Sequence, residues 1–177
     1  MVCGFVKHDN GEEVEIKNNR LDELVNVLQE VQGKTIIWAN YQYDIKRILK
    51  TLQEITGTDS VATYYGETPD EERQEIIRRF QDPNSELQYL ISNVQTGGYG
   101  ITLTEASTVI YYSNNYDLEK RLQSEDRAHR IGQTNKVTYI DLVSKGTVDE
   151  KIVKALRKKL NLAQEVLGDE KWKDWIT

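Results

Sequence analysis

The hydrophobic positions of this chain change period several times, which predicts helices and strands in alternation. From residue 21 to 31, apolar residues recur every three or four positions, the spacing of a helix with one buried face. The β-branched and aromatic run TIIWA follows, and similar short apolar runs recur at 61–65, 87–92, 108–113 and 137–143. Helical spacing returns at 45–52, 69–81, 118–130 and 148–167. Short strands alternating with helices predict an α/β fold with a mostly parallel sheet that helices cover on both faces.

Two tetrapeptides predict where helices begin. Thr68-Pro69-Asp70-Glu71 combines a capping threonine, a proline suited to the first helical position and a capping-box glutamate. Thr147-Val148-Asp149-Glu150 is a second capping box and opens the last helix.

The two ends of the chain differ from its middle. Asp9-Asn10-Gly11 is a turn sequence typical of hairpins, and weak alternation surrounds it. We therefore expect an N-terminal hairpin or arm at 1–18, a single domain at 19–168 and a C-terminal tail at 169–177.

Composition narrows the class of protein. A chain of 177 residues fits one domain, and one cysteine with two histidines supports neither an internal disulfide nor a usual zinc site. No apolar run reaches membrane-spanning length and no charged-then-apolar leader opens the chain, so we expect no membrane partner and a cytoplasmic location. The net charge of −6 argues against a surface coated for nucleic acid, although a local basic groove can still bind phosphates.

Gly33-Lys34-Thr35 has the letters that end an ATPase phosphate loop, but its surroundings differ from that loop. The loop needs a glycine where Leu28 stands, and it runs from a strand into a helix, whereas here a helix precedes the tripeptide and a strand follows it. We therefore predict that Gly33 is a helix C-cap. Asp70-Glu71-Glu72-Arg73 likewise has the letters of an acidic magnesium motif, but it opens a helix instead of following a strand. We expect no metal site in this chain.

A glycine-rich loop follows the strand that ends near residue 92. Its three glycines, Gly97, Gly98 and Gly100, allow the backbone to approach a ligand closely. Taken alone, the loop could also be a simple turn between a strand and a helix.

Two arginines stand three positions apart in QSEDRAHRIGQ. On a helix, Arg127 and Arg130 would share one face and could direct two guanidinium groups at the same anion. The alternative is a solvated helix face on which Glu125 and Asp126 are their ion-pair partners.

Together these segments resemble a known family. GGYGITLTEASTVIYYSNN followed by QSEDRAHRIGQTNKVTYIDLVSKGTVDEKI is similar to the second RecA-like motor lobe of Swi/Snf-like superfamily-two helicases and translocases, over about residues 20–167. The resemblance implies a RecA-like three-layer αβα sandwich. In that family ATP lies between two lobes, and the first lobe supplies the phosphate loop and the acidic magnesium motif. ATP and Mg are therefore expected to be bound mainly by a first lobe, in the same full-length chain or in another polypeptide.

The resemblance also implies roles for individual residues. Arg130 is expected to be the arginine finger and Arg127 its companion. The residues expected to line the ATP cleft are Gln123, Gly98 and Gly100. The residues expected to contact the DNA backbone are Asn40, Tyr41, Gly66, Thr68 and Gly97. For two of these a structural role is the alternative, with Tyr41 packed and Thr68 capping its helix.

The sequence thus predicts the second motor lobe of an ATP-dependent DNA translocase or helicase, unable to hydrolyse ATP appreciably alone. The alternative is a non-catalytic DNA- or protein-binding module derived from a helicase lobe. A dinucleotide-dependent enzyme is disfavoured, since no Gly-x-Gly-x-x-Gly follows the first strand. The hairpin followed by NNRLDELVNVL favours a prokaryotic or phage member, acting in the cytoplasm of a bacterial or phage-infected cell.

Overall fold

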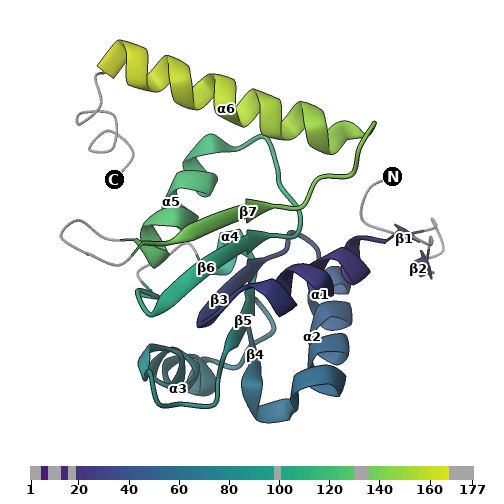
Figure 1. Ribbon diagram of the computed structural model, residues 1–177, viewed down its shortest axis with the longest axis vertical. Helices are drawn as coiled ribbons and strands as arrows, with labels where there is room; N and C mark the ends of the chain where they lie inside the picture. Colours follow the sequence, from purple (N-terminus) through teal and green to yellow (C-terminus); the bar gives the residue numbers. More distant parts are fainter. Residues whose placement is uncertain (1–4, 8–12, 16–18, 98–100, 130–135, 168–177) are drawn as a thin grey trace.

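The computed structural model describes residues 5–7, 13–15, 19–97, 101–129 and 136–167. Its largest part is a sheet with helices on both faces (Figure 1). In chain order the elements of this part are α1 (Arg20–Glu30), β3 (Lys34–Trp38), α2 (Gln42–Thr56), the short 3₁₀ helix η1 (Thr58–Ser60), β4 (Val61–Tyr64), α3 (Asp70–Gln81), β5 (Tyr89–Ser92), α4 (Val94–Gly97), β6 (Ala106–Tyr111), α5 (Leu118–Ala128), β7 (Thr138–Asp141) and α6 (Val148–Leu167). Near the N-terminus, β1 (Phe5–Lys7) pairs antiparallel with β2 (Glu13–Glu15). The domain boundaries at residues 18 and 168 stay predictions.

The main sheet has five strands in the order β4-β5-β3-β6-β7, and every pair in it is parallel. Its carboxyl ends are in register, because Trp38 pairs with both Ser92 and Tyr111, and these pair in turn with Tyr64 and Asp141. The predicted α/β sandwich is confirmed. All five loops that follow the strands therefore leave from one edge of the sheet.

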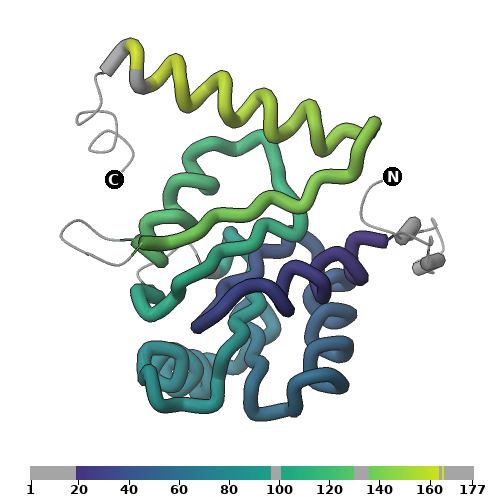
Figure 2. The backbone as a smooth tube through the Cα atoms, in the orientation of Figure 1, coloured from purple at the N-terminus to yellow at the C-terminus, as the bar shows by residue number. Residues whose placement is uncertain are grey.

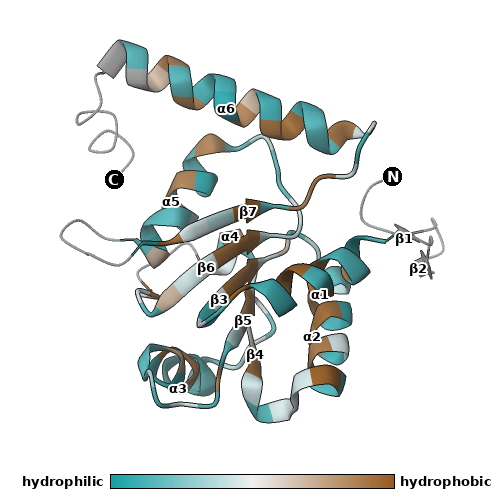
Figure 3. Cartoon of the chain, in the orientation of Figure 1, coloured by the Kyte–Doolittle hydropathy of each residue, from teal (hydrophilic) through white to brown (hydrophobic). Residues whose placement is uncertain are grey.

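Each face of the sheet is covered by a separate hydrophobic core. On one face, α1 and α2 pack against the sheet through residues that recur at helical spacing: Leu21, Leu24, Leu28, Ile45, Ile48 and Leu52. On the other face, α3, α4 and α5 contribute Phe80, Val94 and Ala128. Hydrophobic residues run along the strands between the two layers, which is the pattern of a sheet buried on both sides (Figure 3).

A buried ion pair attaches α6 to the rest of the fold. Arg20, in the first turn of α1, pairs with Asp149 of α6 and donates to the carbonyl of Tyr112 at 2.5 Å. Asp149 also accepts from the backbone N–H of Ser144 at 3.1 Å, and the hydroxyl of Thr147 accepts from the N–H of Asp149 at 3.3 Å. The predicted cap at Thr147 is therefore confirmed. Helix α6 lies at the opposite end of the molecule from α3 (Figure 2).

Two predicted helix ends differ from the structure. Helix α1 ends at Glu30, and its C-cap is Val31, whose backbone is extended. Gly33 lies two residues after the cap with φ +78° at the entry to β3, so it is a turn residue and not the C-cap. Helix α3 begins at Asp70 with Pro69 in the N-cap position, so Thr68 is not the cap either. Both residues are of a type that suits a turn of the chain, but each lies one or two residues away from the position that caps the helix.

Candidate functional site

The topological switch point of the sheet lies between β3 and β6, because the chain leaves these neighbouring strands in opposite directions. Asparagine and serine side chains connect the loops there. The backbone N–H of Asn40 donates to the Ser113 hydroxyl at 2.9 Å, and the Asn93 side-chain amide donates to the carbonyl of Asn40, also at 2.9 Å. The loops after β3, β5 and β6 are thus fixed to one another at the place where open α/β sheets bind ligands.

Three more of the predicted DNA contacts lie in the loops after β3 and β4. The Tyr41 side chain is 48% exposed, so the alternative of a packed tyrosine does not hold. Gly66 is exposed, and a side chain there would meet no atom within 4 Å. Thr68 is 7% exposed, and its hydroxyl accepts from the N–H of Tyr65 and donates to the carbonyl of Thr63. The Thr68 side chain therefore holds the loop after β4 closed.

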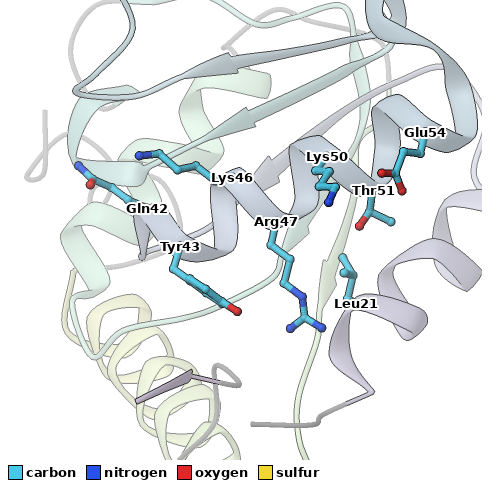
Figure 4. A pocket seen from close by; sticks show the side chains of 8 residues that line it. All are labelled: Leu21, Gln42, Tyr43, Lys46, Arg47, Lys50, Thr51 and Glu54. Carbon is cyan, nitrogen blue, oxygen red and sulfur yellow. The ribbon is translucent and has the colours of Figure 1, made fainter. Parts of the chain in front are cut away.

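A groove of about 600 Å³ runs along α2, starting beside Tyr41. Figure 4 shows its lining side chains, with Tyr43 and Arg47 on the side of Leu21 from α1. The full lining is Leu21, Gln42, Tyr43, Lys46, Arg47, Lys50, Thr51 and Glu54. Three of these eight are cations, and Lys46 also pairs with Glu67 at 2.9 Å. We did not predict this basic groove from the sequence, although the spacing of the cations in DIKRILK is typical of a basic helix face.

The glycine loop and the arginine helix come together on one face of the sheet. Helix α4, which ends at Gly97, packs against α5. Beyond the loop, the backbone N–H of Leu103 donates to the carbonyl of Arg127 at 2.8 Å. Gly98 and Gly100 lie outside the described residues. The segments on either side of the loop are therefore both held against the helix that carries Arg127.

Helix α5 is shorter than predicted. It ends at Ala128, and the backbone of His129 is extended, with φ −125° and ψ 116°. Arg127 is half-buried in the last turn, and Arg130 lies outside the described residues. The expected helix up to residue 130 is therefore wrong at its end, and the joint placement of the two arginines stays a prediction. Gln123, one turn before Arg127, donates from its amide to Glu119 at 3.1 Å.

Arg127 does not lie at the carboxyl edge of the sheet, where open α/β sheets bind ligands. Its carbonyl contacts Leu103, three residues before β6 begins, so this end of α5 lies toward the amino end of that strand. The predicted nucleotide and DNA contacts consequently occupy two places. α4 connects them, since it leaves β5 at the carboxyl edge and packs against α5.

The tripeptide Gly33-Lys34-Thr35 belongs to the opposite edge. Lys34 is the first residue of β3, and its ammonium donates to the carbonyls of Arg79 at 3.1 Å and Asp82 at 2.6 Å, at the end of α3. Burial lowers the pKa of Lys34, while the charges of Asp82 and Glu105 act against that effect. This lysine is a helix C-terminal partner, so the prediction that it is not in a phosphate loop agrees with its position.

Several site residues were missed because their partners are distant in sequence. Asn93 and Ser113 form hydrogen bonds with Asn40, which lies 53 and 73 residues away from them in the sequence. No local sequence pattern predicts contacts over such separations. Among the described residues, His, Cys, Asp and Glu side chains form no group of three or more that could hold a metal ion. Within the same ranges, no helix combines the length and the apolar character needed to cross a bilayer.

A parallel αβα sandwich with an arginine helix packed beside a glycine loop is the architecture of a RecA-like lobe. Residues 16–132 match the family described as helicase conserved C-terminal domain, and the chain therefore belongs to that family. It is 34% identical over 149 residues to human SWI/SNF-related matrix-associated actin-dependent regulator of chromatin subfamily A member 1, covering 83% of this chain and 14% of that protein. The yeast transcription regulatory protein SNF2 is 38% identical over 102 residues, covering 58% of this chain and 6% of that protein.

A solved structure agrees with the sequence relatives. The crystal structure of the C-terminal part of the Fun30 ATPase domain superposes with a TM-score of 0.68 at 26% identity, covering 80% of this chain and 48% of that one. The chain is thus similar to the C-terminal lobe of Swi/Snf-type motors and spans a small fraction of the curated relatives' length. These relatives include human, mouse, fruit fly and yeast proteins, so they give no support to the predicted prokaryotic or phage type.

Proposed function

We propose that this chain acts as the second motor lobe of an ATP-dependent DNA translocase. The observation that carries the proposal is the packing of α4 against α5, with the Leu103 N–H bonded to the Arg127 carbonyl at 2.8 Å. This arrangement holds the last turn of α5, which carries Arg127, against the segments on either side of the glycine loop, and we assign the Arg127 guanidinium to the nucleotide. A planar cation of this kind stabilises the charge that spreads over the γ-phosphate oxygens during phosphoryl transfer.

We assign ATP and Mg mainly to a first lobe. The residues of this chain that would complete the cleft are Arg127, Arg130, Gln123, Gly98 and Gly100. Because the finger comes from a separate lobe, hydrolysis would depend on closure of the two lobes, which couples ATP use to movement.

DNA would run along the carboxyl edge of the sheet and contact Asn40, Tyr41, Gly66 and Gly97 through its phosphates. Such contacts position a strand without reading its sequence. The Thr68 hydroxyl is already bonded inside its loop, so its part is to shape that loop. The basic groove along α2 begins at Gln42, next to Tyr41, and adds positive charge on the same side.

The test is steady-state ATPase of this chain, alone and combined with a first lobe that carries the phosphate loop, with and without DNA. We expect no appreciable turnover alone and DNA-stimulated turnover in combination. Arg130→Ala should lower the combined kcat by about 10³-fold or more while the circular dichroism spectrum is unchanged. Robust turnover by the isolated chain would reject the split site. DNA binding without restored turnover would favour the non-catalytic module.

A further inference from the structure

Arg121 lies at the beginning of α5, six residues before Arg127, and is the centre of a half-buried polar network. Its Nε donates to Glu125 at 2.6 Å and its Nη1 to the Asn114 side chain at 2.9 Å. Nη1 also pairs with Asp141 at 2.5 Å, and Nη2 lies 3.4 Å from the second oxygen of the same carboxylate. The Arg121 side chain is 13% exposed. One guanidinium therefore joins α5, the loop after β6 and the last residue of β7.

The same guanidinium stacks on an aromatic ring. Its Cζ atom lies 3.4 Å from the centroid of Tyr111, the last residue of β6. The Tyr111 hydroxyl shares a 2.6 Å hydrogen bond with Ser124, and Ser124 donates to the carbonyl of Arg121. Burial raises the pKa of Tyr111 well above its ordinary value, so the hydroxyl stays protonated. The Tyr111 side chain therefore packs against the first two turns of α5.

We propose that Arg121, through its pair with Asp141, is a positioning residue that sets the orientation of the arginine-bearing helix α5. The inference rests on the proposed function, since it assigns Arg121 the task of aiming Arg127 and the chain beyond it at the nucleotide. All three guanidinium nitrogens of Arg121 bond to neighbouring side chains, so we assign it no contact with ATP.

The geometry explains why one contact has this influence. At its far end, α5 is held by the bond from Leu103 to the Arg127 carbonyl and by the Tyr139 hydroxyl, which donates to the Glu125 carbonyl at 3.4 Å. At its near end, the Arg121 network attaches it to β6 and β7. Arg127 lies about 9 Å along the helix axis from Arg121, so a small tilt at the near end displaces it. Misplacement of a reacting group by about 1 Å can cost on the order of 100-fold in rate.

The experiment is a charge exchange between the two partners. Arg121→Asp, Asp141→Arg and the double variant are compared in the two-lobe assembly for kcat, for KM of ATP and for DNA affinity. Each single variant should lower kcat at least about tenfold with little change in KM, and the double variant should be several-fold more active than either single one. Losses that simply add, or an Arg121→Asp protein with wild-type kcat, would overturn the proposal.

The chain offers a matched control and a second readout. Arg78 and Glu75 form a comparable two-bond pair on α3, with Arg78 69% exposed, and exchanging their charges should leave kcat unchanged. Amide hydrogen exchange of residues 118–128 in this chain alone should speed up in each single variant and slow again in the double variant. If the wild-type assembly lacks ATPase, the proposed function fails, and the exchange data still decide whether the pair orients α5. Arg121→Lys, which keeps the charge without the planar fork, replaces Arg121→Asp if that protein does not fold.

Discussion

Two regions of this molecule place glycine beside a basic side chain, and they are built in opposite ways. At the entry to β3, Lys34 is buried and donates to two backbone carbonyls, and a Cβ at Gly33 would lie 2.6 Å from the Ser107 hydroxyl. In the second region, the glycine loop after β5 is flanked by α4 and Leu103, both of which contact the helix that carries Arg127.

The difference shows that the structural surroundings separate the two roles better than residue type does. The first region lies at the amino edge, where chain entering a parallel sheet is fixed by the end of a neighbouring helix. The second begins at the carboxyl edge, where a parallel sheet offers its loops to ligands. A Gly-Lys-Thr tripeptide, which matches the end of a phosphate-loop sequence, can therefore have a purely structural role.

The strongest test of this contrast is Arg127→Ala. In the assembly with a first lobe, we expect kcat to fall by about 10²- to 10³-fold, the loss typical of removing one preorganised donor to developing charge. The free energy of unfolding, measured by urea titration, should change by less than about 1 kcal/mol, since Arg127 is in the last turn of a helix held by its backbone. A wild-type kcat in this variant would place the second region with the first, as structure without catalysis.

Much of the fold could be predicted because its signals are local. The run TIIWA and the helical spacing around it sufficed for β3 and its flanking helices. The strand order could not be predicted, because β3 occupies the middle of the sheet through pairing with β5 and β6, far away in the chain. The meeting of Asn40 with Ser113 is of the same kind. The end of α5 at Ala128 was missed because the sequence there has neither glycine nor proline.

The roles that we propose for Arg127 and the glycines could be predicted only through family resemblance. Their spacing alone left a solvated helix face and a simple turn open. The structure adds that α4 and α5 bring the two segments together.

Gly33→Ala tests the first region by conformation. Gly33 has φ +78°, which costs a residue with a Cβ about 1–2 kcal/mol, and the new Cβ would also displace the Ser107 hydroxyl from its 2.6 Å bond to the Gln32 carbonyl. We expect a loss of about 2–3 kcal/mol in the free energy of unfolding by urea titration. The control is Gly66→Ala, which meets no neighbour within 4 Å and should stay within about 0.5 kcal/mol of wild type. Equal effects at both glycines would show that the conformation of Gly33 and its contact with Ser107 carry no special cost.

Lys34→Met gives the smallest effect and tests the first region by charge. Methionine keeps the apolar stem but leaves the carbonyls of Arg79 and Asp82 without their donor, so we expect a loss of about 1–2 kcal/mol and an unchanged kcat in the two-lobe assay. The variant should also differ from wild type in its pH dependence. Burial lowers the Lys34 pKa, so the unfolded chain binds this proton more tightly, and wild-type stability should gain from this group as pH rises toward 10.5. That gain should be missing in Lys34→Met. A large fall in kcat with unchanged stability would instead mark Lys34 as a functional cation and end the contrast between the two regions.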